Sequence, residues 1–232
     1  MEFRSGTPLK HLRQVGLGLA SRDKLKRVEA VELLLSWLLH RLSDEQRAEH
    51  LGFAPPLSAA HMPDARLYPN REEMLKALPR GGRVAEVGTY RGAFAQRIAA
   101  ACAPDELHLV DVDLSVLDRA PVRAAFEGRL IEHEGDSAAI LATFPPASFD
   151  WIYLDADHRY PAVSADLAMS HAALRPGGYL MCNDYTNWDV GSAQPYGVAR
   201  AVNEFCLRHD YRVLGLALER AGYHDILLRK PA

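Results

Sequence analysis

The sequence has few cysteines, no long uncharged apolar run and little net charge, and each shortage argues against a class of protein. Its three cysteines, Cys102, Cys182 and Cys206, form no C-x-x-C pair, which argues against a disulfide framework or a structural zinc site. No run approaches the roughly 18 apolar residues of a membrane-spanning helix. The net charge of −3 gives no basic excess of the kind that nucleic-acid-binding proteins carry. The basic N-terminal segment lacks an apolar stretch with a cleavage site, so we expect a cytoplasmic protein that binds neither membranes nor nucleic acid.

The first third of the chain has helical rather than strand-like patterning. Apolar residues between 22 and 41 fall mostly on one broad helical face, and Ser43-Asp-Glu-Gln46 has the form of a capping box. Prolines predict a loop at 52–68, and Asn70 is a candidate helix cap. We interpret residues 1–80 as an N-terminal helical extension; a lid or a dimerisation arm is the alternative, which leaves a homo-oligomer open.

From residue 83 onward, strand-like and helix-like segments alternate. Predicted strands cover 83–87, 107–111, 129–133, 150–155, 178–183, 211–218 and 223–229, and predicted helices lie near 91–102, 115–126, 137–142, 160–174 and 197–208. Such alternation implies an α/β domain, here residues 81–232, with a mostly parallel, doubly wound sheet. The short connection containing Gly222 predicts an antiparallel hairpin at one edge.

The most informative stretch is residues 84–92, where an apolar run ends in Gly88, Gly92 follows, and a helix-like segment begins. A glycine here lets the chain turn sharply and lets a ligand approach the backbone, while the helix N-terminus offers unpaired N–H groups. The dinucleotide fingerprint would place another glycine where this chain has Tyr90, which disfavours a pyrophosphate ligand. Asp111 ends the next predicted strand, at the offset of roughly 20 residues that a β-α-β unit imposes.

The acidic-Val-Gly-x-x-x-Gly motif, in which Glu86 is the acid, resembles motif I of the class I S-adenosylmethionine (SAM) dependent methyltransferases. The resemblance extends from about residue 83 to 229 and implies a Rossmann-like, seven-stranded sheet with SAM as cofactor. It implies cofactor contacts at Glu86, Gly88, Thr89, Gly92, Asp111, Asp136, Ser137 and Asp155. In that family the acid at Asp111 binds the ribose hydroxyls and the acid at Asp136 binds the adenine amino group. A helix cap is the simpler interpretation of Asp136.

Polar residues follow two further predicted strands and form a second candidate site. The strand 151–154 is followed by Asp155 and His158, and the next strand leads to Asn183 and Asp184. Open α/β sheets bind ligands at this carboxyl edge, and a group of oxygen ligands suits Mg²⁺.

This second site resembles that of the metal-dependent O-methyltransferases, both the catechol type and the type that modifies antibiotic sugars. The resemblance implies Asp155, Asn183 and Asp184 as metal ligands, with Asp155 and His158 as catalytic residues and His158 as the general base. The pair Asn183-Asp184 departs from the Asp-Asn and Glu-Asp pairs of those enzymes. In the simpler interpretation, Asp155 and Asp184 bind loop backbone and His158 is a surface histidine.

The sequence therefore predicts a methyltransferase that uses SAM, with Mg²⁺ as a candidate second cofactor, and methylates a hydroxyl of a small molecule. Two alternatives stay open. An NAD-dependent oxidoreductase would also use Gly88 and Asp111, and a non-catalytic SAM-binding protein would need only the first site.

Overall fold

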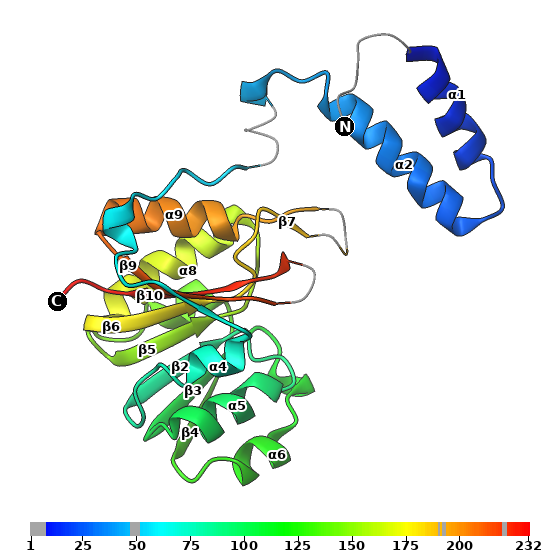
Figure 1. Ribbon diagram of the computed structural model, residues 1–232. Helices are drawn as coiled ribbons and strands as arrows, with labels where there is room; N and C mark the ends of the chain where they lie inside the picture. The colour runs from blue at the N-terminus through cyan, green and yellow to red at the C-terminus, as the bar shows by residue number, and fades with distance from the viewer. Residues whose placement is uncertain (1–7, 47–51, 190, 192–193, 220–221) are drawn as a thin grey trace. The chain divides into compact units, whose positions relative to one another are not determined.

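The computed structural model describes residues 8–46, 52–189, 191, 194–219 and 222–232. The chain forms two compact units, residues 1–51 and residues 52–232. The first unit contains helices α1 (Pro8–Leu19) and α2 (Lys24–Leu39), which pack on each other (Figure 1). The helix predicted at 22–41 is thus confirmed, and so is the capping box. The Ser43 hydroxyl accepts from the Gln46 backbone at 3.1 Å, and the Gln46 side chain accepts from the Ser43 backbone at 3.0 Å.

The second unit is built on an eight-stranded sheet with the strand order β1-β9-β10-β6-β5-β2-β3-β4. The strands are β1 (Arg66–Tyr68), β2 (Arg83–Val87), β3 (Glu106–Asp111), β4 (Arg129–Glu134), β5 (Phe149–Leu154), β6 (Leu174–Cys182), β9 (Arg212–Ala217) and β10 (Asp225–Arg229). All run parallel except β10, which pairs antiparallel with β6 and β9. A separate ribbon pairs β7 (Trp188–Asp189) with β8 (Gln194–Pro195).

The predicted α/β class and the predicted antiparallel hairpin are confirmed, with one strand added. The prediction of a loop over 52–68 is wrong at its end, because Arg66–Tyr68 pairs with residues 215–217 of β9. The hairpin therefore lies one strand inside the sheet edge. Because β1 and the helix after it belong to the sheet-bearing unit, that unit begins at residue 52 rather than at the predicted boundary of 81.

Helices cover both faces of the sheet (Figure 1). One face packs against α4 (Arg71–Leu75), α5 (Ala93–Cys102), the 3-10 turn η2 (Leu114–Val116) and α6 (Arg119–Ala124); the other packs against α7 (Ser137–Leu141), α8 (Tyr160–Ala173) and α9 (Val198–His209). A further 3-10 turn, η1 (Ala59–His61), precedes β1. Central strands such as β5 are buried on both faces, which explains their continuous apolar runs. The three cysteines are free and buried. No described helix is both long and apolar enough to cross a membrane.

The strand order creates a topological switch point beside β2. From β2 the chain continues through β3 and β4 on one side, and then through β5 and β6 on the other. Connections on opposite faces leave a crevice at the carboxyl ends of β2 and β5, where open α/β sheets bind their ligands. The loops after these two strands carry Gly88 and Asp155.

Candidate functional site

The glycine loop after β2 is packed too tightly against the end of β5 to accept a side chain. Gly88 has a φ of 91°, and a Cβ there would lie 1.9 Å from the backbone oxygen of Asp155. Gly92 also has a positive φ, of 78°, and a Cβ there would lie 2.6 Å from Val122. Both predicted glycines are therefore required by the local structure, and they form a backbone-lined cradle at the switch point.

Asp111 lies at the end of β3 and fixes the same loop. One carboxylate oxygen accepts a hydrogen bond from the Tyr90 backbone N–H at 2.6 Å, and the other accepts from the Asp113 N–H at 3.1 Å. Tyr90 has a φ of 48°, which is uncommon for a residue with a side chain. Each carboxylate oxygen keeps a further lone pair, so ribose hydroxyls can still donate to Asp111.

Glu86 is a buried carboxyl group near the end of β2, two residues before Gly88. Its side-chain atom Oε2 has no hydrogen-bond partner among the described residues, and complete burial raises the pKa of Glu86 well above its ordinary value. Nearby, the Thr89 hydroxyl donates to the Glu86 backbone oxygen at 3.4 Å. An unpaired buried oxygen beside a glycine cradle fits a donor group on a bound cofactor.

Asp136 and Ser137 follow β4 at the same edge of the sheet but are already engaged. Asp136 caps α7 by accepting from the Ala139 N–H at 2.9 Å, which confirms the simpler interpretation of this residue. The Ser137 hydroxyl donates to Asp166 at 2.6 Å. Their contacts to a cofactor stay predictions. Glu86, the glycine cradle and Asp111 are the features that fit SAM.

The second predicted cluster converges as expected. The Asn183 amide donates to Asp155 at 2.8 Å, and His158 Nε2 lies 3.6 Å from Asp155 and 3.5 Å from Asp184. Burial, followed by the nearby charge of Asp184, raises the pKa of Asp155 to about 7. Burial also raises the pKa of Asp184, whose φ of 51° is strained for a residue other than glycine. Strain and buried carboxyls at a ligand-binding edge indicate a functional site.

The side chain of His158 is 19% exposed and is packed against its neighbours. Its ring stacks on Tyr196 with centroids 4.7 Å apart, and its backbone oxygen accepts from the Gly197 N–H at 2.8 Å. Burial lowers the pKa of His158 below its ordinary value, although the neighbouring carboxylates oppose this shift. The imidazole is therefore mostly neutral at pH 7, the form that accepts a proton.

Arg71 is a member of the site that the sequence did not predict. Its Nη1 donates to the Tyr153 hydroxyl and to Asn183 Oδ1, each at 3.1 Å, and lies 3.9 Å from Asp155. The helix cap at Asn70 predicted where α4 begins, but no local pattern indicates that its first residue reaches the ends of β5 and β6.

The side chains at the predicted magnesium site do not fit a bound Mg²⁺ ion. Among the described residues, no group of three or more His, Cys, Asp or Glu side chains is placed to hold a metal ion. Asn183 turns its oxygen to Arg71 and its nitrogen to Asp155. Flipping the amide would bring its NH₂ group against the guanidinium, so the partners fix this orientation. A cation, Arg71, already lies among the groups that were expected to bind Mg²⁺.

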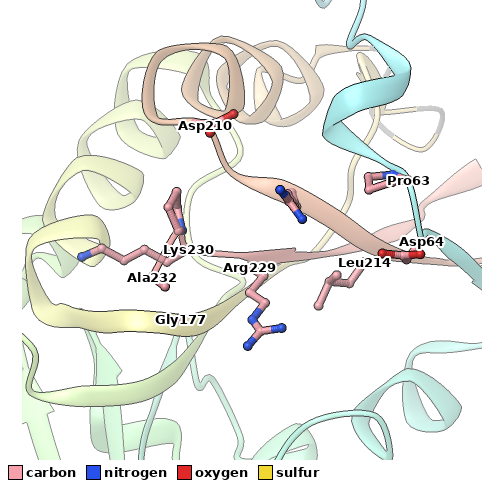
Figure 2. Close-up of a pocket in the computed structure, with 10 residues that line it drawn as sticks. Pro63, Asp64, Gly177, Asp210, Leu214, Arg229, Lys230 and Ala232 are labelled. Atoms are coloured by element: carbon pink, nitrogen blue, oxygen red, sulfur yellow. The ribbon is translucent and has the colours of Figure 1, made fainter.

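An open hollow of about 430 Å³ lies over this cluster. It is lined by Arg71, Asp155, Asn183, Asp184, Asp189, Tyr196, Glu219 and Tyr223. A second hollow, of about 380 Å³, lies at the opposite edge of the sheet, where β9 begins and β10 ends (Figure 2). It is lined by Arg212, Arg229 and Lys230 together with Asp64 and Asp210, among others, and by none of the predicted site residues.

Comparison with known proteins agrees with this geometry. Residues 85–185 match a family model described as a methyltransferase domain, which is less than half of the chain. No curated protein matches the sequence.

Several solved structures share the fold at low sequence identity. The 1,6-didemethyltoxoflavin-N1-methyltransferase of Burkholderia thailandensis, solved with 1,6-didemethyltoxoflavin and S-adenosylhomocysteine, is 17% identical, with a TM-score of 0.52 over 69% of this chain and 78% of that one. The N-methyltransferase NodS of Bradyrhizobium japonicum WM9 is 18% identical, with a TM-score of 0.52 over 70% and 95%. The B. subtilis M1A22 tRNA methyltransferase TrmK is 14% identical, with a TM-score of 0.52 over 70% and 65%. The chain thus has the Rossmann-like methyltransferase fold.

Proposed function

We propose that the chain is a SAM-dependent methyltransferase that methylates a hydroxyl group of a small molecule, with His158 as the general base. The observation that carries the proposal is the placement of His158. A neutral imidazole lies within 3.6 Å of Asp155 and Asp184, and both carboxyls line the hollow. The segment after β5 that carries His158 also carries the backbone oxygen of Asp155, which lies against Gly88 in the glycine cradle.

On the cofactor side, the cradle at Gly88, the buried carboxyl of Glu86 and the carboxylate of Asp111 would hold SAM. When bound, SAM supplies a methyl group on a positively charged sulfur. The residues that would hold the cofactor lie at the carboxyl ends of β2 and β3, and β2 pairs with β5, after which the polar cluster follows. The protein therefore contributes mainly alignment of the two reactants and removal of a proton.

On the acceptor side, the hollow has the size of an ordinary small-molecule pocket. A hydroxyl oxygen becomes a good nucleophile when it loses its proton, and His158 can accept that proton. Asp155 and Asp184 would then stabilise the imidazolium that forms. Two of the similar structures are N-methyltransferases. A hydroxyl acceptor is favoured here because a neutral amine already carries a free lone pair and has less need of a base.

The test compares wild-type protein with His158→Ala, using a panel of phenols and sugars and measuring S-adenosylhomocysteine formation. We expect the substitution to lower turnover by about 10²- to 10⁴-fold, the usual range for a general base, while SAM affinity is retained. In the wild type, turnover should fall on acidification only below the ordinary histidine pKa, because burial keeps His158 neutral to lower pH.

His209→Ala is the matched control, because His209 lies away from the site. It ends α9 and precedes Asp210, which lines the hollow at the opposite edge of the sheet. Titration with SAM and with NAD separates the two cofactor hypotheses, and binding of NAD alone would rule out the methyltransferase. Turnover of amines but not of hydroxyls would show that the acceptor is an amine. Full activity of His158→Ala would show that His158 is not the general base.

A further inference from the structure

Arg71 is held firmly at the mouth of the site by its own short helix. The Asn70 side chain caps α4 by accepting from the Glu73 N–H at 2.8 Å, and the Arg71 backbone N–H donates to Glu219 at 2.8 Å. The guanidinium lies over the ring of Phe94, 4.9 Å from its centroid. Because the helix also buries Met74 completely in the core, the position of Arg71 is determined by packing.

The Arg71 guanidinium joins the ends of two adjacent strands. Its Nη1 donates to the hydroxyl of Tyr153, on β5, and to Oδ1 of Asn183, directly after β6. Tyr153 in turn donates to Asp225 at 3.1 Å. The Nε and Nη2 donors of Arg71 make no bond to another described residue. Part of the guanidinium is thus fixed by the protein, while its side chain is 28% exposed and lines the hollow.

Charge explains why a cation is needed at this point. Burial raises the pKa of Asp155, Asp184 and Asp225, and the nearby Arg71 guanidinium opposes this shift in each, so it stabilises their ionised forms. Arg71 is the one arginine or lysine among the described residues that line the hollow. A divalent ion at Asp155 and Asn183 would meet the guanidinium, which already binds the Asn183 oxygen.

We infer that Arg71 takes the place of a divalent metal ion in this site: it binds the acceptor oxygen in the hollow and stabilises the negative charge that is left when the hydroxyl gives its proton to His158. That oxygen would then bond to the methyl carbon of SAM as the carbon–sulfur bond breaks and S-adenosylhomocysteine is left, so methyl transfer needs no metal. This inference rests on the proposed function. A guanidinium is permanently charged and presents several N–H donors in a fixed plane, which suits an oxygen that gains charge. Arg71 then has a catalytic role alongside His158.

The first test is a titration of Mg²⁺ and of Mn²⁺ into chelator-treated wild-type protein, with and without S-adenosylhomocysteine, followed by calorimetry. We expect no metal binding, and we expect turnover to be unchanged in excess EDTA. Arg71→Met should lower turnover by about 10²- to 10³-fold, the usual loss for one oxyanion-stabilising donor, with S-adenosylhomocysteine affinity unchanged. Arg71→Lys should be intermediate, because an ammonium keeps the charge and loses the planar donors.

Arg129→Met is the control, since Arg129 is 70% exposed and pairs with Glu106 at the start of β3, away from the hollow. Site-specific Mg²⁺ binding to the wild type, or loss of turnover in EDTA with recovery on adding Mg²⁺, overturns the inference. Full turnover of Arg71→Met also overturns it. If Arg71→Met does not fold, as judged by cofactor binding, Arg71→Lys and the wild-type titration decide. A wild type that methylates no acceptor contradicts the proposed function. The metal titration would still show whether the site with Arg71 binds a divalent ion, so the two failures can be told apart.

Discussion

At the scale of single residues, Ser137 and Asp166 show how a neighbour changes what a side chain offers. Ser137 was predicted to contact the cofactor, yet its hydroxyl donates to the buried Asp166 at 2.6 Å. Asp166 is 3% exposed, and burial raises its pKa to about 6 even though the bond from Ser137 opposes the shift. Asp166 therefore keeps its proton in the folded protein at pH values where the unfolded chain has lost it.

This difference predicts a pH-dependent stability. Between pH 4 and pH 6 the unfolded chain binds fewer protons at Asp166 than the folded chain, so the free energy of unfolding falls as pH rises. The contribution of this one group is at most about 3 kcal/mol. Asp166→Asn keeps an acceptor for Ser137 and removes the titration. Urea unfolding at both pH values should show a smaller decline for the variant than for the wild type, and equal declines would contradict the assignment.

At the scale of elements, α4 shows that a short helix can matter more than its length suggests. It has five residues, and its N-terminus is fixed by the side chain of Asn70. The buried Met74 and Leu75 connect it to the core, and its first residue, Arg71, reaches the strand ends. The Asn70 cap fixes where α4 begins, and the start of α4 fixes the position of the charged Arg71 side chain in the site.

Removing the cap should affect both stability and turnover. Asn70→Ala loses the bond to the Glu73 N–H and should lower the free energy of unfolding by about 1 kcal/mol. Turnover should also fall, because Arg71 follows the cap directly. Asn70→Asp is the control, since aspartate caps helices as well as asparagine does. Denaturant titration and steady-state kinetics measure the two effects, and an Asn70→Ala protein with unchanged unfolding would show that packing alone holds α4.

At the scale of the whole molecule, the chain separates into two units with different amounts of core. In the described part of the first unit only Val15 and Ala30 are buried among the apolar residues, while Leu17 and Leu25 are 67% and 65% exposed. A two-helix unit of this size buries too little apolar surface to be stable alone. Whether the N-terminal helices are only an extension, or form the alternative lid or dimerisation arm, stays a prediction.

Deleting residues 1–51 tests that prediction. The residues assigned to cofactor binding all lie in the second unit, so SAM affinity measured by calorimetry should be unchanged. Turnover should fall if the helices close over the acceptor. Light scattering on both proteins would show whether the deletion changes the oligomeric state. A deletion protein with full turnover and the same oligomeric state would leave the first unit without a part in catalysis.

The sequence by itself determined seven of the eight strands of the sheet, the glycine cradle and the convergence of four polar residues. Strand and helix periodicities are local, and a glycine at a sharp turn is a local requirement. Asp155, His158, Asn183 and Asp184 could be placed together because parallel strands end at one edge. Each of these inferences needs only a short stretch of chain and one rule of topology.

Only the tertiary structure decided the strand β1, the role of Arg71 and the state of the buried carboxyls. The three residues of β1 carry no alternation and form a strand because β9 lies beside them. Arg71 meets Glu219 across 148 residues of sequence, and the Asn183 oxygen faces Arg71 instead of being free for a metal ion. The raised pKa of Asp155 comes from burial and from Asp184. Burial and charge depend on which distant segments pack together, and no local pattern carries that information.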